Sequence, residues 1–119
     1  RIGSPQVGDI VVYRYNGTEA VKRVAAVGGD TLSIVDGEVI LNGKNLGLFF
    51  APRERVKNRR YMQTAPTLVE KNHVYLLGDN RDSSNDSRFM GQVKVDDITG
   101  IVTGIWWSED RSRIGTVFP

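Results

Sequence analysis

Two stretches of the sequence hold residue types that could do chemistry, namely EAVKRV at 19–24 and GDNRDSSNDSR at 78–88. The first places the amine of Lys22 near apolar residues, and the second is an unbroken polar run rich in hydroxyl, amide and carboxylate groups. An amine removed from water gives up its proton more readily, so it can act as a general base or as a nucleophile. The chemistry available to Lys22 therefore depends on whether the fold removes its amine from water.

Side-chain alternation bears on the position of Lys22. If 19–27 is a strand, successive side chains point to opposite faces. The two faces are then Glu19, Val21 and Arg23 on one side, and Ala20, Lys22 and Val24 on the other. In one interpretation Lys22, flanked by two apolar neighbours, is removed from water. In the alternative Lys22 is solvated and Arg23 pairs with a nearby acid, and alternation alone favours this alternative.

The polar run at 78–88 favours the interpretation in which Lys22 is removed from water, because the run is predicted to form a stiff loop. Gly78 can adopt backbone conformations that are closed to other residues. Four further residues can bond to their own backbone in Asx and Ser turns: Asp79, Asn80, Ser83 and Ser84. Asp86 and Arg88 would project the same way if the loop ends in an extended stretch, and they would then form a pair or meet partners on other strands.

Metal binding is not expected. The acids of 78–88 do not follow the calcium-loop spacing, because Arg81 stands at a ligand position and the final glutamate is missing. The chain has no cysteine, and a single histidine, His73, cannot build a zinc cluster or serve a histidine triad by itself. We therefore expect no metal and no organic cofactor, and we interpret His73 as a surface residue.

Composition indicates a globular protein. The 119 residues suffice for one domain, 1–119, and the 39% hydrophobic and 25% charged contents are ordinary for a folded chain. A net charge of +2 does not predict nucleic-acid binding, and the basic run RERVKNRR at 53–60 is interpreted as a solvated surface. No apolar run approaches the roughly 18 residues of a membrane span, so any anchor is expected outside this chain.

Most of the sequence predicts short antiparallel strands. An Asn-Gly turn joins strands expected at 9–15 and 19–27, and an Asp-Gly turn joins strands expected at 31–35 and 38–44. The range 45–70 has no sustained period and is expected to be an irregular excursion with one or two short strands. A strand at 72–77 leads into the polar loop. The range 92–107 predicts a strand, a break and a long strand, and the tail that follows could add an edge strand.

Four blocks of the chain resemble the type I signal peptidases, which are bacterial membrane-bound Ser/Lys proteases. They are GDIVV at 8–12, VKRVAAVGGD at 21–30, EVILNGK at 38–44 and GDNRDSSNDSRFMG at 78–91, in the order found in that family. The last block is the most specific. The resemblance implies an all-β fold of antiparallel coiled sheets, forming a partly open barrel or sandwich.

The resemblance also implies roles for particular residues. Lys22 would be the general base, and the hydroxyl of Ser84 would orient its amine. Ala20 and Val21 would lie on the edge that binds the extended substrate by strand addition. Supporting positions around the site would be Gly78, Asp79, Asn80, Asp86, Ser87, Arg88 and Arg23, with Asp86 and Arg88 as a structural charge pair.

The implied activity is removal of signal peptides from exported preproteins at the extracytoplasmic side of the bacterial cell membrane. The partners would be signal peptides and the membrane surface, with no nucleic acid. Trp106 and Trp107 could lie at the membrane interface, and by alternation one of them should be buried.

The chain departs from the family pattern in one serious respect. The family's nucleophilic serine lies in an SMxP motif before the GDIVV block, and this chain has no such motif, since Ser4 lacks the methionine and is too close. The fragment alone is therefore expected to be inactive. Ala26 and Gly28, where the family usually has Gly and Pro, are milder departures. The alternatives are an inactive signal-peptidase-like binding or assembly factor, or a self-cleaving Ser/Lys protease of the phage-repressor type, which the 78–88 block disfavours.

Overall fold

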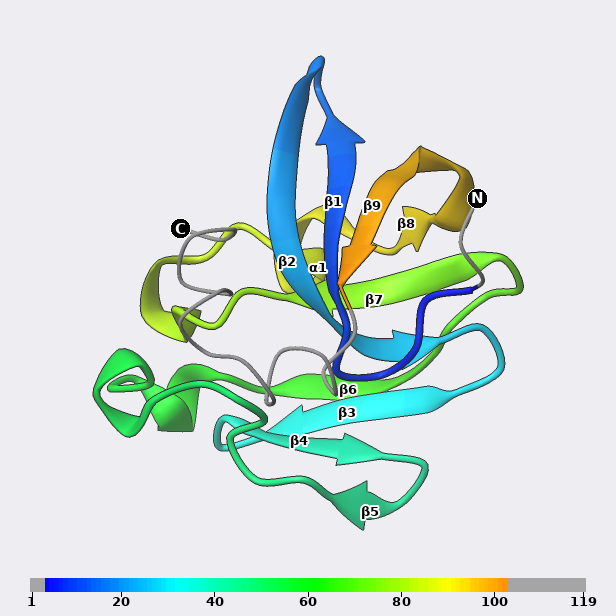
Figure 1. Cartoon of the computed structure of the whole chain (residues 1–119). Helices are drawn as coiled ribbons and strands as arrows, with labels where there is room; N and C mark the ends of the chain where they lie inside the picture. Colours follow the sequence, from blue (N-terminus) through cyan, green and yellow to red (C-terminus); the bar gives the residue numbers. More distant parts are fainter. Residues whose placement is uncertain (1–3, 103–119) are drawn as a thin grey trace.

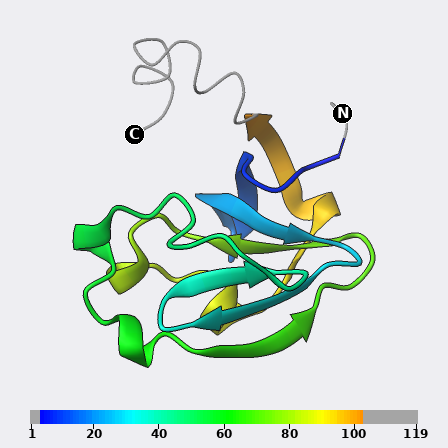
Figure 2. The same ribbon diagram turned by 90° about the horizontal axis from the view of Figure 1, so that it is seen from below.

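Two antiparallel sheets make up the fold. The computed structural model describes residues 4–102, so the predictions for Trp106, Trp107 and the C-terminal tail lie outside the described residues. The larger sheet has five strands in the order β8-β7-β2-β1-β9, and the smaller has four in the order β5-β4-β3-β6 (Figure 1). Seen from below, β3, β4 and β6 form one layer, and β9 lies at the opposite side of the molecule (Figure 2).

Two hairpins supply the central strands. The turn between β1 (Ile10–Tyr15) and β2 (Thr18–Val27) holds Asn16 and Gly17 at φ 52° and 80°, as a tight hairpin turn requires. The turn between β3 (Thr31–Val35) and β4 (Glu38–Leu41) does the same with Asp36 and Gly37, at φ 50° and 81°. Both hairpins were predicted from these dipeptides.

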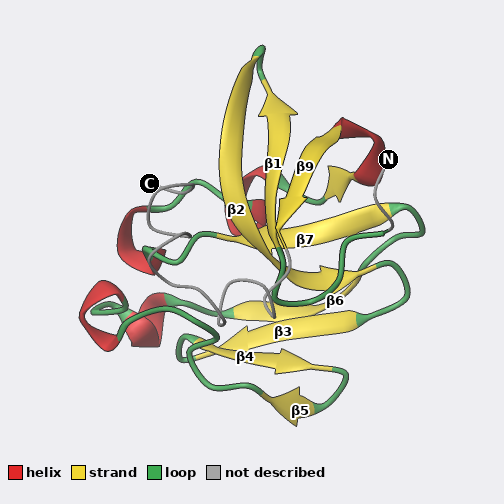
Figure 3. Ribbon diagram, in the orientation of Figure 1, coloured by secondary structure: helices red, strands yellow, loops and turns green. Residues whose placement is uncertain are grey.

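The remaining elements are short. The strands are β5 (Lys44–Asn45), β6 (Thr64–Leu68), β7 (His73–Leu77), β8 (Val93–Lys94) and β9 (Ile98–Val102). The helical turns are η1 (Arg53–Arg55), η2 (Arg59–Tyr61), η3 (Arg81–Ser83), α1 (Ser87–Met90) and η4 (Val95–Asp97). Figure 3 shows η1, η2 and η3 on the same side of the molecule and η4 on the other side, whereas α1 lies near the middle of the view, behind β1 and β2.

Strands β2 and β7 contribute to two separate hydrophobic clusters. Val24, Val74 and Leu76 pack with β1 side chains in one cluster, which also includes Val93 and Ile98. The other cluster contains Ala25, Ala26, Tyr75, Leu77, Leu32, Ile34, Val39, Phe49 and Val69. Because alternate side chains leave opposite faces of a strand, β2 and β7 serve both clusters and hold the two sheets together.

The prediction of an all-β antiparallel fold is confirmed. The expected excursion contains one well-paired strand, β6, which runs antiparallel to β3. The polar loop is less irregular than expected, because η3 lies inside it and α1 begins at its end. Within residues 4–102, no helix combines the length and apolar character that crossing a bilayer requires.

Candidate active site

Lys22 lies near the middle of β2, on the same face as the buried residues of β1. Its register partner is Val11, and its neighbour Ala20 pairs with Tyr13. Val11 and Tyr13 are almost completely buried, whereas Lys22 is half-buried. The Lys22 Nζ donates a hydrogen bond to the Ser84 Oγ over 3.1 Å. The fold therefore brings the amine and the hydroxyl together from positions 62 residues apart.

Gly78 makes room for this contact. A Cβ placed on Gly78 would overlap the Ser84 Oγ, and it would lie 2.6 Å from the Ser84 Cβ and 3.4 Å from the Lys22 Nζ. Position 78 is thus a glycine because the Ser84 side chain approaches its backbone closely. The space of a side chain at 78 is occupied by the hydroxyl that bonds the lysine.

A buried carboxylate holds the loop on its other side. Asp86 is 0% exposed; its Oδ2 accepts the Gly78 N–H at 2.9 Å, and its Oδ1 accepts the Arg88 Nε at 2.9 Å. Ser87 lies beside it, and its Oγ accepts the Leu76 N–H at 2.8 Å. Asp86 is the N-cap of α1, so it pairs with Arg88 across the first turn of a helix and not along the extended stretch that the sequence suggested.

Arg23 fixes the loop to β2 from the opposite strand face. It is 5% exposed, and its Nε and Nη2 donate to the two carboxylate oxygens of Asp79 at 3.1 and 2.9 Å. Its Nη1 donates to the Gly8 carbonyl at 3.0 Å. Bidentate pairs of this kind define both distance and orientation. The half-buried lysine and the paired arginine thus occur together, although the sequence presented them as alternatives.

Arg81 is a part of the site that the sequence analysis did not identify. It is 3% exposed, its Nε donates to the Gly78 carbonyl at 2.6 Å, and its Nη2 donates to the Phe49 carbonyl. Burial, and then the neighbouring Arg88, lower the pKa of Arg81 to about 10, which leaves it charged at neutral pH. In the sequence Arg81 is one polar residue in a polar run, and no local signal marks it as buried.

The loop is stiffened by contacts with other elements. The Asp79 carboxylate and the Ser84 hydroxyl bond to β2, where the sequence had suggested turns within the loop itself. Asn80 is exposed, and its carbonyl accepts the Ser83 N–H as η3 begins. Thus all the predicted supporting residues lie in or against this loop, with Asn80 at its surface.

The half of β2 that carries Ala20 and Val21 has an open edge. Strand β1 pairs with β2 from Thr18 to Arg23, whereas β7 pairs with it only from Arg23 to Val27. In residues 4–102, no strand lies beside the second edge of Thr18–Lys22, as Figure 1 shows for the upper part of β2. Val21 is exposed there. An extended peptide could add to this edge.

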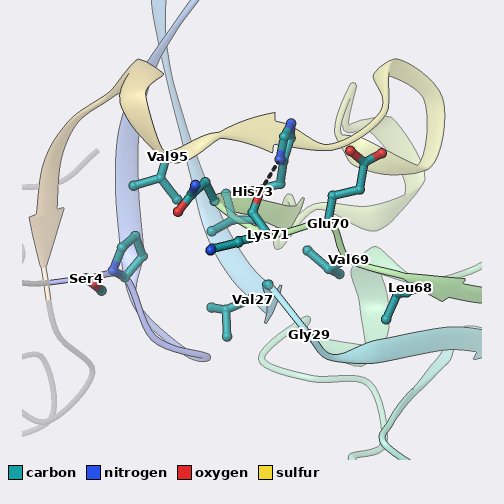
Figure 4. Close-up of a pocket in the computed structure, with 13 residues that line it drawn as sticks. Ser4, Val27, Gly29, Leu68, Val69, Glu70, Lys71, His73 and Val95 are labelled. Atoms are coloured by element: carbon teal, nitrogen blue, oxygen red, sulfur yellow. Dashed lines mark hydrogen bonds between the residues drawn. The ribbon is translucent and has the colours of Figure 1, made fainter.

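A separate cavity of about 530 Å³ lies at the other end of β2 (Figure 4). Its lining includes Val27, Gly29, Val69 and His73, and the exposed Ser4 lies at its margin. The His73 Nδ1 lies 2.9 Å from the Lys71 carbonyl. Across residues 4–102, no group of three or more histidine, cysteine, aspartate or glutamate side chains is arranged to hold a metal ion.

Comparison with known proteins points to one family. A family model described as signal peptidase, peptidase S26, matches residues 1–107. Signal peptidase I of Pseudomonas fluorescens is 26% identical over 162 residues, covering 98% of this chain and 57% of that protein. Signal peptidase IB of Staphylococcus aureus (strain Mu50) is 30% identical over 121 residues, covering 90% of this chain and 63% of that protein.

Solved structures give the same result. The crystal structure of a signal peptidase I from Enterococcus faecalis V583 matches with a TM-score of 0.73 and 29% identity, covering 87% of this chain and 100% of that chain. The chain spans roughly half the length of the Pseudomonas relatives that it matches. Since the family model covers nearly all of its residues, this chain belongs to the S26 family of signal peptidases.

Proposed function

We propose that the chain is the β domain of a peptidase that removes signal peptides from exported preproteins, with Lys22 as the general base. The observation that carries the proposal is the 3.1 Å hydrogen bond from Lys22 Nζ to Ser84 Oγ, next to the open edge of β2. A positioned base and an edge that accepts an extended peptide are both needed for proteolysis. Membership of the signal peptidase family supports the same activity.

In the proposed reaction the nucleophile is a serine outside this chain, in the segment that precedes GDIVV in the family. Its hydroxyl oxygen attacks the scissile carbonyl carbon while the neutral Lys22 amine takes the hydroxyl proton. Lys22 then gives the proton to the departing amine as the carbon–nitrogen bond breaks. Water hydrolyses the resulting ester, again with Lys22 as base. Ser84 accepts a hydrogen bond from the amine and fixes its direction. The chain by itself is then inactive.

The substrate would bind as an added strand along Thr18–Lys22, with Ala20 and Val21 at the contact. A strand added there would bring the scissile bond near the Lys22 amine, because Lys22 ends the open edge. The reaction would take place at the extracytoplasmic face of the bacterial cell membrane.

The test uses the full-length gene product in lipid vesicles, with a preprotein as substrate. Lys22→Ala should lower the cleavage rate by about 100-fold or more, and Ser84→Ala should lower it by a smaller factor, because a misdirected amine still accepts protons. Lys71→Ala, at an exposed lysine by the cavity of Figure 4, is the matched control and should cleave normally. Normal cleavage by Lys22→Ala would contradict the assignment.

A binding or assembly factor without catalysis is the second candidate, because an open strand edge binds an extended peptide whether or not cleavage follows. The Lys22–Ser84 contact favours the enzyme, since peptide binding alone gives no evident reason for that pair. If the full-length wild-type protein binds the preprotein and leaves it intact, the binding role is correct.

A further inference from the structure

Two consecutive phenylalanines take the left-handed backbone conformation, just before η1. Phe49 has φ 51° and Phe50 has φ 66°. This conformation is disfavoured for bulky side chains, and it persists only where the surrounding contacts enforce it. Backbone of this kind is concentrated at functional sites. The contacts of the pair therefore indicate what the conformation achieves.

Phe50 contacts the arginine that fixes the loop. The Arg23 Cζ lies 4.0 Å from the centroid of the Phe50 ring, which is cation–π distance. The ring also packs over Gly8, where an added Cβ would come within 3.8 Å of it. Phe50 nevertheless remains 57% exposed. Burial of the ring therefore does not account for its position, whereas its contact with the guanidinium does.

Phe49 reaches the same loop through its backbone. Its carbonyl accepts a hydrogen bond from Arg81, and that guanidinium donates through Nε to the Gly78 carbonyl at 2.6 Å. The Phe49 side chain is buried in the core, and the two phenylalanine rings meet edge to face with centroids 5.1 Å apart. The left-handed turn thus directs the Phe49 carbonyl to one arginine and the Phe50 ring to the other.

The two arginines act on adjacent residues. Arg81 holds Gly78, and Arg23 holds Asp79. Gly78 is the residue whose missing side chain leaves space for the Ser84 hydroxyl. A small displacement of the Gly78–Asp79 backbone would therefore change the distance between that hydroxyl and the Lys22 amine.

We propose that the Phe49–Phe50 pair is a clamp that positions the Lys22–Ser84 contact: the Phe50 ring holds Arg23 against the loop, and the Phe49 carbonyl anchors Arg81, which belongs to the loop. Phe50 is a positioning residue, since it touches neither the amine nor the hydroxyl among the described contacts. The structural part of this inference stands on the contacts alone. Its consequence for catalysis rests on the proposed peptidase function.

The first measurement is hydrogen exchange on the chain itself, which does not depend on activity. Phe50→Asn removes the ring and keeps a residue that tolerates positive φ. The Gly78 N–H, which bonds to Asp86, should exchange roughly ten-fold faster in this variant. Tyr61→Asn is the matched control, because Tyr61 is 76% exposed and its ring contacts only the surface cation Arg60 among the described cation–π pairs. The control should leave Gly78 exchange unchanged.

The second measurement is peptide cleavage by the full-length gene product. Phe50→Asn should lower kcat by roughly ten- to a hundred-fold with KM unchanged, and Phe50→Tyr, which keeps the ring, should restore kcat. If Phe50→Asn does not fold, Phe50→Gly removes the ring at a position where glycine is unstrained, and the same results are expected.

The outcomes separate the two claims. Faster Gly78 exchange in an assay where the wild type does not cleave would support the clamp and contradict the peptidase function. Normal Gly78 exchange together with normal kcat in Phe50→Asn, even with a lower melting temperature, would overturn the clamp.

Discussion

Two neighbouring segments of the molecule, the loop at 78–88 and the basic segment at 53–60, are both short, irregular and rich in charge. They touch each other, because the Asp82 carboxylate accepts the backbone N–H groups of Lys57 and Asn58 at 2.9 and 3.3 Å. Figure 3 shows their helical turns on the same side of the molecule. Their charged side chains nevertheless differ in burial.

The loop fully buries two of its charged side chains and leaves none fully exposed, whereas the basic segment exposes most of its cations. Asp86 and Arg81 are almost fully buried, and each has several hydrogen-bond partners. In the basic segment most cations are exposed, and its one ion pair in the described residues, Arg59 with Glu38 at 2.9 Å, lies at the surface. Charge content therefore did not decide burial. Burial occurred where strand ends and neighbouring backbone supplied partners for every polar atom.

The largest expected difference between the segments comes from removing one carboxylate from each. Asp86→Ala leaves the Arg88 guanidinium and the Gly78 N–H buried without their partner, so the free energy of unfolding should fall by about 3–5 kcal/mol. Glu54→Ala, at an exposed acid in η1, should change it by less than about 0.5 kcal/mol. Urea denaturation measures both. A similar loss of unfolding free energy in the two variants would contradict this difference between the buried and the exposed carboxylate.

Packing around the loop gives a smaller effect. Gly78→Ala forces its Cβ into the space of the Ser84 hydroxyl, so it should destabilise the fold by about 1–3 kcal/mol. It should also abolish the Lys22–Ser84 hydrogen bond, which nuclear magnetic resonance of the lysine amine would detect. Gly100→Ala is the control, because its Cβ would meet only Val12 atoms at 3.8 Å. An unperturbed amine in Gly78→Ala would show that the loop is softer than its contacts imply.

The smallest effect concerns pH, because the buried charge of the loop also acts on two tyrosines. Burial first, and then the Asp86 charge, raise the pKa of Tyr13 above 10.0. Burial also raises the pKa of Tyr75, and together with the Asp86 charge it outweighs the hydrogen bond to Thr64, which lowers that pKa. Both phenols therefore contribute stability below the ordinary value of 10.0, and this contribution is lost as the pH rises through their pKa values in the folded protein.

Denaturation midpoints measured between about pH 8 and pH 11 test this dependence. Stability should fall at the alkaline end, and Tyr13→Phe should make the fall less steep, since its ring still packs in the core and it no longer ionises. An identical slope in wild type and Tyr13→Phe would exclude the tyrosine contribution.

Much of the fold could be predicted from local pattern. The Asn16-Gly17 and Asp36-Gly37 turns were located correctly because tight hairpins require positive φ at those positions, which is a local steric fact. The range 45–70 could not be predicted in the same way. Strand β6 in this range is defined by its pairing with β3. The contact of the range with the site depends on the Phe50 ring meeting Arg23.

The sequence alone determined most of the strands and the two hairpin turns, since alternation and turn chemistry act over a few residues, and the resemblance to a family pointed to Lys22 and Ser84. Only the tertiary structure decided that Arg81 is buried, that Arg23 lies under the Phe50 ring, and that Gly78 gives its side-chain space to Ser84. Burial of a charged or polar group depends on partners far away in the chain. For that reason no window of a few residues contains the information.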